Sequence, residues 1–466
     1  MVRHATTTVT IWAVLTLAYS SALADWTRFR GPNGSGLDAG DKPAPTTWSD
    51  SENLRWKVAL PGPGSSSPIV VGDRVFVTCW SGYGMDRGDP GEQEQLQRHL
   101  VAIDSDTGET IWSKSVEPYL PEDEYRGMFT QHGYASHTPV SDGQRVYVFF
   151  GKTGALAFDM EGNQLWQTSV GTGSGPRGWG TASSPILYNN LLIITATAES
   201  EALVGLDKET GEEVWREETE GFNSVWGTPV LVPVDADRTD LVLSVTEEVW
   251  GLNPETGRLR WYCESFPSSS ICASAVAHDG VVYVMDSSPG GSGRIAVRAG
   301  GKGDVTDTHV VWSGRESTRV VTPILHEGRL YAFSNKTASC YDAATGDQLF
   351  SERLRSPGAS GSAQTEETAG PGRRGGPGRA GGGRRRGGGM GGQDYASPVL
   401  AGGNLYFPSR AGDVFVLKPG DRFEQLAVNR FDHDGEDFSA TPAVSNGRLF
   451  IRSSKHLYCV ALEKDG

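Results

Sequence analysis

Eight residues of this chain carry side chains that could together form a ligand site. They are His132, His137, Arg177, Trp179, Trp226, Arg319, Tyr395 and Asp437. Aromatic faces with a few convergent polar groups are typical of sites that bind a small molecule or a peptide. No catalytic residue is assigned among them. In an alternative interpretation, the tryptophans plug a channel and the neighbouring Ser and Thr residues only bond the backbone of turns.

Metal binding is a weaker interpretation of these residues. His132 and His137 lie five positions apart on an expected loop, which is a poor spacing for a metal site. The acids of the segment 432–437 could supply hard oxygen ligands, but their spacing does not match a Ca²⁺-binding loop. An acidic surface loop explains that segment as well. We therefore expect no metal site, and we find no nucleophile elbow, phosphate-binding loop or metalloprotease helix.

One recurring phrase indicates the elements that position the candidate residues. It runs from a small residue through Asp or Asn and a Gly to an aromatic residue, and it occurs at Ala102–Trp112, Ala157–Trp166, Gly205–Trp215, Gly251–Trp261 and Cys340–Phe350. Asp or Asn opens a turn through its side chain, and Gly adopts the left-handed conformation that closes the turn. The aromatic residue then leads an outer strand, where it can be buried between neighbouring sheets. The phrase therefore predicts two strands joined by a tight turn.

A second pair of strands precedes each phrase. Eight such pairs open at Ser67, Thr138, Ser184, Thr228, Ser274, Thr322, Ser397 and Thr441, usually followed by Pro, and hairpin pairs such as Gly-Asp or Asn-Gly interrupt them. Each unit thus has four strands. Sheets of this kind bury their faces when they repeat radially, so we predict an all-β, eight-bladed propeller of four-stranded antiparallel blades.

The two ends of the chain predict how the ring closes. The last unit stops at 457–466 without an aromatic strand, and the segment 54–58, with Trp56, supplies one. We expect this N-terminal strand to complete the last blade. The segments before the innermost strands should then meet at one mouth of the central channel, which is why the eight candidate residues are grouped.

The repeated phrase resembles that of the pyrroloquinoline-quinone-type propellers, an eight-bladed family. The resemblance covers nearly the whole chain from Trp26, and the segment 26–34 is similar to the start of secreted members. The family includes outer-membrane assembly propellers and quinoprotein alcohol dehydrogenases. The resemblance to the assembly propellers implies a binding or protein-interaction scaffold, with an envelope protein or a small molecule at the mouth.

The resemblance also leaves an enzymatic alternative, a quinoprotein dehydrogenase that oxidises an alcohol or a sugar. Those enzymes use adjacent cysteines, a Ca²⁺ held by Glu, Asn and Asp, and an Asp base. This chain has five cysteines and no adjacent pair. We therefore expect no cofactor. The alternative is pyrroloquinoline quinone bound with Ca²⁺, with the quinone stacked on Trp179 or Trp226.

The N-terminus predicts export. Arg3 precedes a short apolar run, and Ala22-Leu-Ala24 fits a signal-peptidase site, so residues 1–24 read as a signal peptide and 25–466 as one domain. The run is too short to span a bilayer. We expect a periplasmic or secreted monomer. The net charge of −15 argues against binding to nucleic acid.

Three regions depart from the repeat. The polar segments 81–99 and 117–137 are predicted to be surface loops. The segment 358–392, rich in Gly and Arg, is predicted to be disordered, either as a linker or as a basic arm for an anionic polymer. Cys263 and Cys272 are close enough in sequence to bridge a loop, or else they pack as small apolar residues.

Overall fold

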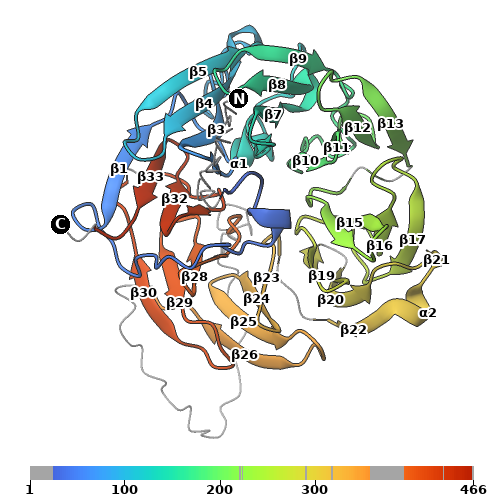
Figure 1. The fold of residues 1–466 in the computed structure, drawn as a ribbon. Coiled ribbons are helices and arrows are strands. Elements are labelled where there is room, and N and C mark those ends of the chain that lie inside the picture. The colour runs from blue at the N-terminus through green and yellow to red at the C-terminus, as the bar shows by residue number, and fades with distance from the viewer. Residues whose placement is uncertain are drawn as a thin grey trace, which may run out of the picture.

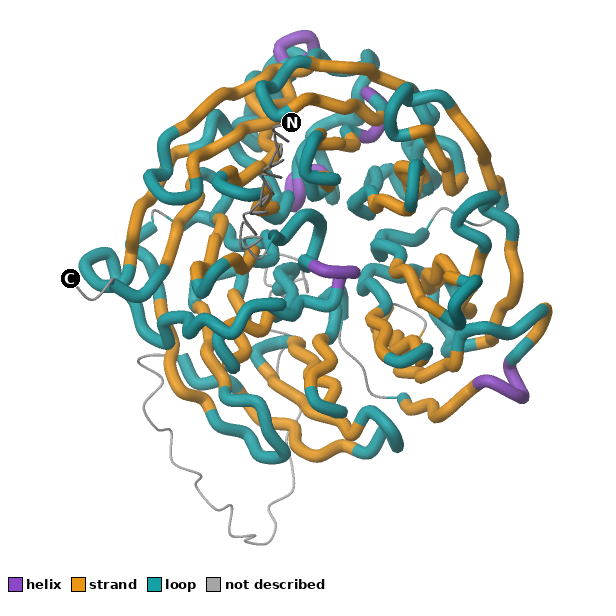
Figure 2. Tube along the Cα trace, in the orientation of Figure 1, coloured by secondary structure: helices purple, strands orange, loops and turns teal. Residues whose placement is uncertain are grey.

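The repeat units form a ring of β-sheets around a central channel in the computed structural model of the chain (Figure 1; Figure 2). The structure describes residues 25–463 except 220, 221, 223, 289, 290, 316–318, 357–392 and 434. Within these residues there are eight sheets of four antiparallel strands, one of them extended by a short parallel strand. The predicted eight-bladed propeller is confirmed. The predicted signal peptide and the Gly/Arg-rich segment lie outside the described residues.

Blades 1 to 4 follow one another along the chain. Blade 1 comprises β2 (Ile69–Val71), β3 (Arg74–Ser81), β4 (Gln97–Asp104) and β5 (Thr110–Val116). Blade 2 comprises β6 (Val140–Ser141), β7 (Arg145–Phe149), β8 (Ala155–Asp159) and β9 (Gln164–Thr168). Blade 3 comprises β10 (Ile186–Tyr188), β11 (Leu191–Ala196), β12 (Ala202–Asp207) and β13 (Glu213–Glu218). Blade 4 comprises β14 (Val230–Pro233), β15 (Thr239–Val245), β16 (Glu248–Leu252) and β17 (Leu259–Glu264), with β21 (Gly303–Asp304) parallel to β17.

Blades 5 to 8 complete the ring. Blade 5 comprises β18 (Val276–His278), β19 (Val281–Ser288), β20 (Gly291–Arg298) and β22 (Val310–Gly314). Blade 6 comprises β23 (Ile324–His326), β24 (Arg329–Ser334), β25 (Thr337–Asp342) and β26 (Gln348–Arg353). Blade 7 comprises β27 (Val399–Ala401), β28 (Asn404–Pro408), β29 (Val414–Leu417) and β30 (Gln425–Asn429). Blade 8 comprises β31 (Ala443–Ser445), β32 (Arg448–Arg452), β33 (His456–Val460) and the N-terminal β1 (Leu54–Ala59). The helical segments are α1 (Phe129–His132), α2 (Thr306–His309), η1 (Pro32–Gly34), η2 (Gln93–Gln95) and η3 (Gly151–Thr153).

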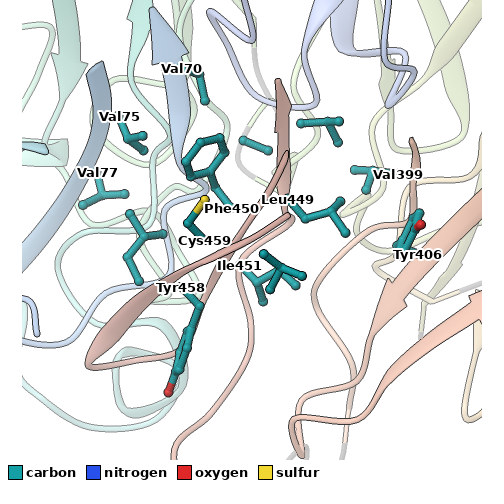
Figure 3. Close-up of a cluster of buried hydrophobic side chains, with 14 of the residues drawn as sticks. Val70, Val75, Val77, Val399, Tyr406, Leu449, Phe450, Ile451, Tyr458 and Cys459 are labelled. Atoms are coloured by element: carbon teal, nitrogen blue, oxygen red, sulfur yellow. The ribbon is translucent and has the colours of Figure 1, made fainter. Parts of the chain in front are cut away.

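The predicted closure of the ring is confirmed in blade 8. Strand β1 pairs antiparallel with β33, and Trp56 lies opposite Cys459. Figure 3 shows the buried side chains of β32 and β33, such as Phe450 and Leu449, between residues of blades 1 and 7. The two ends of the chain thus share one sheet, and its faces are buried by both neighbouring blades.

The repeated aromatic and glycine residues join consecutive blades. Trp56 of blade 8 packs against Gly108 of blade 1, where an added Cβ would lie 2.7 Å from the indole Cδ2. The Trp56 Nε1–H donates to the carbonyl of Ser105 at 3.1 Å. Further Trp–Gly pairs occur at Trp112–Gly162, Trp166–Gly211, Trp215–Gly257 and Trp312–Gly346. The repeated glycine is therefore required both for its turn (φ 76° at Gly108) and for this close approach.

A ring of hydrogen bonds encircles the channel at the openings of the innermost strands. In each blade the hydroxyl of the opening Ser or Thr accepts the backbone N–H of the corresponding residue in the neighbouring blade, at 2.9–3.1 Å. The eight residues are Ser67, Thr138, Ser184, Thr228, Ser274, Thr322, Ser397 and Thr441. These hydroxyls do bond the backbone, as one interpretation predicted, but they bond the neighbouring blade and not a turn.

The segment 26–37 closes the channel, and we call it the plug. It enters through a bridge between Trp26 and Val70 and leaves through a bridge between Leu37 and Leu400, and in Figure 1 this dark blue segment reaches the centre of the ring. Arg30 is fully buried within it. The interpretation in which tryptophans plug the channel is therefore wrong, because this N-terminal segment occupies it.

The two insertions predicted as surface loops instead form a small lobe beside the mouth. Strand β3 continues to Ser81 and strand β4 begins at Gln97, so the first insertion is shorter than predicted. The lobe has its own buried cluster, made of Trp80, Tyr83, Leu96, Phe129, Tyr134 and Ala135. These aromatic residues bury enough apolar surface to order the polar, Gly-rich chain around them. The lobe carries α1 to the mouth of the channel.

All five cysteines are free thiols, so Cys263 and Cys272 form no disulfide. Among the described residues, no helix combines the length and the apolar character needed to cross a membrane.

Candidate functional site

A pocket lies at the mouth of the channel, above the plug. Its volume is about 200 Å³, and Phe29 of the plug contributes to its lining. Five of the predicted site residues line it, namely His132, Trp179, Trp226, Arg319 and Tyr395. The structure thus brings these five together, and their role in binding stays a prediction. We call this cavity the mouth pocket.

Trp179 and Trp226 form an aromatic pair on one wall of the mouth pocket. Their ring centroids are 5.3 Å apart and the planes are inclined by 37°. The Trp226 Nε1–H donates to the carbonyl of Gly180 at 2.8 Å, which fixes the ring against the loop that carries Trp179. Arg177 lies over the Trp179 ring, 5.2 Å from its centroid. The pair offers two half-buried aromatic faces to a flat or apolar ligand.

His132 ties the lobe to the loop of Trp179. Its Nε2 is 2.9 Å from the carbonyl oxygen of Trp179, and its Nδ1 is 2.9 Å from the Ser136 hydroxyl. Burial lowers the pKa of His132, so the ring is neutral at physiological pH. We assign the proton to Nε2, because a carbonyl only accepts, and Nδ1 then accepts from Ser136. Both ring nitrogens are therefore hydrogen-bonded, and His132 holds the loop of Trp179 in place at the wall of the mouth pocket.

Arg319 and Tyr395 lie on the pocket wall formed by blades 6 and 7. The carbonyl of Arg319 accepts from Gln393 Nε2 at 3.0 Å and from the N–H of Val321 at 2.9 Å. The residue between them, Val320, has φ 71°, which is strained for a β-branched side chain. Among the described residues, no acid forms an ion pair with the Arg319 guanidinium. A tight, strained turn thus presents a cation to the pocket.

Three predicted residues do not line the mouth pocket. His137 is buried in a side chamber and bonds Thr181 at 3.0 Å. Arg177 is exposed, and its guanidinium bonds Ser224 Oγ and the Ser269 carbonyl. Asp437 pairs with Arg410 at 2.7 Å and is half exposed. The prediction that all eight residues share one pocket is therefore wrong for these three, because hydrogen bonds and an ion pair hold their side chains outside its lining.

The side chamber shares its wall with the mouth pocket. His132 and Ser136 line both cavities. Glu199 is buried in the chamber and accepts from the Thr181 hydroxyl at 2.9 Å. Burial raises the pKa of Glu199 to about 7, and burial lowers the pKa of His137 to about 3. Burial thus favours the uncharged form of both groups.

Sequence reasoning missed several residues of the mouth. Ser287 and Ser288 line the pocket from the end of β19, Met128 and Gln131 line it from the lobe, and Arg410 contacts Gln131 from the loop after β28. Ser287, Ser288 and Arg410 lie at the end of the second strand of a blade or in the loop that follows it. Antiparallel strands alternate in direction, so these loops share a mouth with the segments before the innermost strands. That topological rule was the available signal.

Comparisons with known proteins agree with this architecture. The profile of the family described as outer membrane protein assembly factor BamB matches residues 39–196 and 162–368. The solved structure of BamB from Moraxella catarrhalis shares 11% identity with this chain, with a TM-score of 0.56, and the match covers 88% of this chain and 99% of that one. At this identity the structural likeness shows the fold alone.

Two oxidoreductases are also similar. The quinohemoprotein alcohol dehydrogenase from Comamonas testosteroni has a TM-score of 0.59 and 10% identity, and the match covers 95% of this chain and 82% of that one. A polyvinylalcohol dehydrogenase from a Pseudomonas species is 21% identical over an aligned length of 285 residues, and the match covers 51% of this chain. This chain spans 40% of the length of that dehydrogenase.

The family profile matches well over half of the chain, and the repeat, the eight blades and the closing strand agree with it. The chain therefore belongs to the family of BamB-like propellers with the pyrroloquinoline-quinone-type repeat.

Proposed function

We propose that this protein is a binding propeller whose mouth pocket holds an organic ligand, either a small molecule or a side chain of an envelope protein. The observation that carries the proposal is the aromatic pair Trp179 and Trp226 on the wall of a cavity that the plug closes from below. A concave site with aromatic faces and a few convergent polar groups favours ligand binding. We further propose a periplasmic or secreted location, which the expected signal peptide supports.

The dehydrogenase relatives raise a second candidate, a calcium-bound quinone in the same pocket. Ca²⁺ takes six to eight oxygen ligands, and carboxylates dominate such sites. The described residues that line the mouth pocket include neither Asp nor Glu. In the described part of the chain, no group of three or more His, Cys, Asp or Glu is placed to hold a metal. The side chains that line the mouth pocket do not fit a calcium-bound quinone. We propose that the protein binds its ligand without this cofactor.

Fluorescence titration tests the binding proposal. N-Phenyl-1-naphthylamine and its sulfonated analogue, 8-anilinonaphthalene-1-sulfonate, are environment-sensitive probes that are excited by energy transfer from Trp. We expect saturable binding of at least one probe, a loss of affinity of about tenfold in Trp226→Leu, and no change in Trp250→Leu. Trp250 is the matched control because it stacks on Phe222 outside the pocket. Unchanged binding in Trp226→Leu would refute the proposed site.

Addition of pyrroloquinoline quinone with and without Ca²⁺ tests the second candidate. We expect no dye-linked oxidation of an alcohol. Turnover that requires both additions would overturn the scaffold proposal and establish the dehydrogenase. Retention of an envelope protein on the immobilised wild type, but not on Trp226→Leu, would identify a protein as the natural ligand.

A further inference from the structure

Three arginines are buried around the channel. Arg28, Arg30 and Arg452 are at most 8% exposed. Their guanidinium groups bond mainly to backbone carbonyls, and no acid among the described residues forms an ion pair with any of them. Buried charges are normally paired, because an unpaired charge in a medium of low dielectric constant is costly. Three unpaired cations around one channel therefore make its interior electropositive.

Each buried guanidinium donates to the carbonyl of a residue that lines the mouth pocket or directly follows a lining residue. Arg30 donates to the carbonyl of Thr322 at 3.3 Å, and Thr322 itself lines the pocket. Arg28 donates to the carbonyl of Pro229 at 3.1 Å, one residue after the lining Thr228. Arg452 donates in the same way to the carbonyl of Ser66 at 2.8 Å, one residue after the lining Ser65. The three charges thus bond to the backbone segments that carry the lining of the pocket.

These arginines stay charged at neutral pH. Burial lowers the pKa of Arg30 to about 9 and those of Arg28 and Arg452 to about 10. All three values lie above physiological pH. Their field is weakly screened, because the plug and the blades exclude solvent from them.

The acids near the pocket are bonded to backbone N–H groups or to Arg410. Asp286 accepts the backbone N–H of Cys272 at 2.6 Å, and burial raises its pKa to about 6. Asp394 accepts the N–H of Arg410 at 2.9 Å, and Asp437 pairs with the Arg410 guanidinium. None of these acids lines the mouth pocket. Arg319, by contrast, lines it, and its guanidinium forms no ion pair with an acid in the described part of the chain. Its positive charge also acts on the buried Asp286 and favours the ionised form of that carboxyl.

The lining also supplies neutral donors. The hydroxyls of Thr228, Ser274, Thr322 and Ser397 line the pocket, and each oxygen already accepts a backbone N–H. Among the described residues, no acceptor bonds the hydrogens of these four hydroxyls, so they are available to a ligand. A group with lone pairs and negative charge satisfies both these donors and Arg319.

We propose that the mouth pocket selects organic anions, whose apolar body lies against Trp179 and Trp226 and whose acidic group is held by Arg319 and the hydroxyls. This inference rests on the proposed function and names the chemical class of its ligand. The electric field of Arg28, Arg30 and Arg452 also favours a negatively charged ligand. A neutral ligand of equal shape loses this interaction and leaves the hydroxyl donors and Arg319 without an acceptor.

The two naphthalene probes test the sign of the charge, because they differ only in a sulfonate. We expect the wild type to bind 8-anilinonaphthalene-1-sulfonate at least tenfold more tightly than N-phenyl-1-naphthylamine. Arg319→Met should reduce this ratio several-fold, and Arg319→Lys should restore part of it. Arg422→Met, at an exposed hairpin of blade 7, serves as the control and should leave the ratio unchanged.

The outcomes separate the two proposals. Tighter or equal binding of the neutral probe, or a ratio that Arg319→Met leaves unchanged, overturns the preference for anions and leaves the binding function in place. Failure of both probes to bind overturns the proposed function and the preference with it. Circular dichroism of each variant verifies that the propeller is folded.

Discussion

Arg410 and Gln131 meet across the mouth of the channel, where the Arg410 Nη1–H donates to Gln131 Oε1 at 2.8 Å. The two residues are 279 positions apart, one in the loop after β28 of blade 7 and the other in α1 of the lobe. Arg410 also pairs with Asp437 and lies 5.3 Å from the centroid of the Tyr395 ring. This contact joins the lobe to blade 7 and helps to hold the wall of the mouth pocket.

Loss of this contact should loosen the pocket with little effect on the ring. Arg410→Met keeps the aliphatic stem and removes both the bond to Gln131 and the pair with Asp437. We expect binding of 8-anilinonaphthalene-1-sulfonate to weaken about three- to tenfold, since a charge-assisted hydrogen bond contributes about 1–2 kcal/mol. Hydrogen exchange should accelerate in residues 126–136 but not in β11 or β12. Unchanged exchange in the lobe would contradict this role.

Trp56 should contribute strongly to global stability, because it joins the closing strand to blade 1. The ring is 8% exposed and packs on Gly108, and its Nε1–H bonds Ser105. Trp56→Ala should lower the free energy of unfolding by about 3–5 kcal/mol, the usual cost of removing a large buried aromatic side chain. Urea denaturation measures this change. Trp250→Ala is the control and should cost clearly less, because that ring is partly exposed.

Arg30 should stabilise the plug even though no acid pairs with it. Its guanidinium donates to the carbonyls of Pro323 at 2.7 Å and Pro398 at 3.1 Å. Arg30→Met fills similar space but leaves these buried carbonyls without a donor, which should cost about 2–4 kcal/mol. A melting temperature equal to that of the wild type would show that the plug does not need this bond network. The exposed Arg422→Met again provides the control.

Glu199 should make the protein less stable as the pH rises through neutrality. Its pKa is raised by burial to about 7 in the folded state, against an ordinary value of 4.5. A raised folded pKa gives stability that is complete below pH 4.5 and is lost as the pH approaches 7. Glu199→Gln should remove this dependence, which amounts to about 3 kcal/mol. Urea denaturation from pH 4.5 to 8 measures it, and parallel profiles for the two proteins would contradict the burial argument.

His137 should act in the opposite direction. Burial and the neighbouring His132 and Arg98 lower its pKa to about 3, whereas the unfolded chain titrates near 6.5. The contribution is therefore present above pH 6.5 and is lost as the pH falls toward 3. His137→Gln should flatten the acid limb of the stability profile. Its neutral limb, which depends on Glu199, should keep its slope.

The repeat determined the ring, and the segments 54–58 and 457–466 determined its closure. Turn glycines, strand alternation and the recurring aromatic residue are local signals, because each depends on backbone conformation and on burial between adjacent sheets. The last unit, which stops at 457–466, lacks an outer aromatic strand, and the segment around Trp56 is an aromatic strand without a unit of its own. The ring could therefore close in one way. Those predictions needed no knowledge of which loops converge.

The composition of the mouth pocket was decided by tertiary structure. Five of the eight expected residues line it, but His137 turns into the side chamber and Asp437 pairs with Arg410. The plug, the lobe and the contact between Arg410 and Gln131 join segments far apart in the chain. Such contacts depend on where irregular loops end in space, and no local periodicity encodes that position.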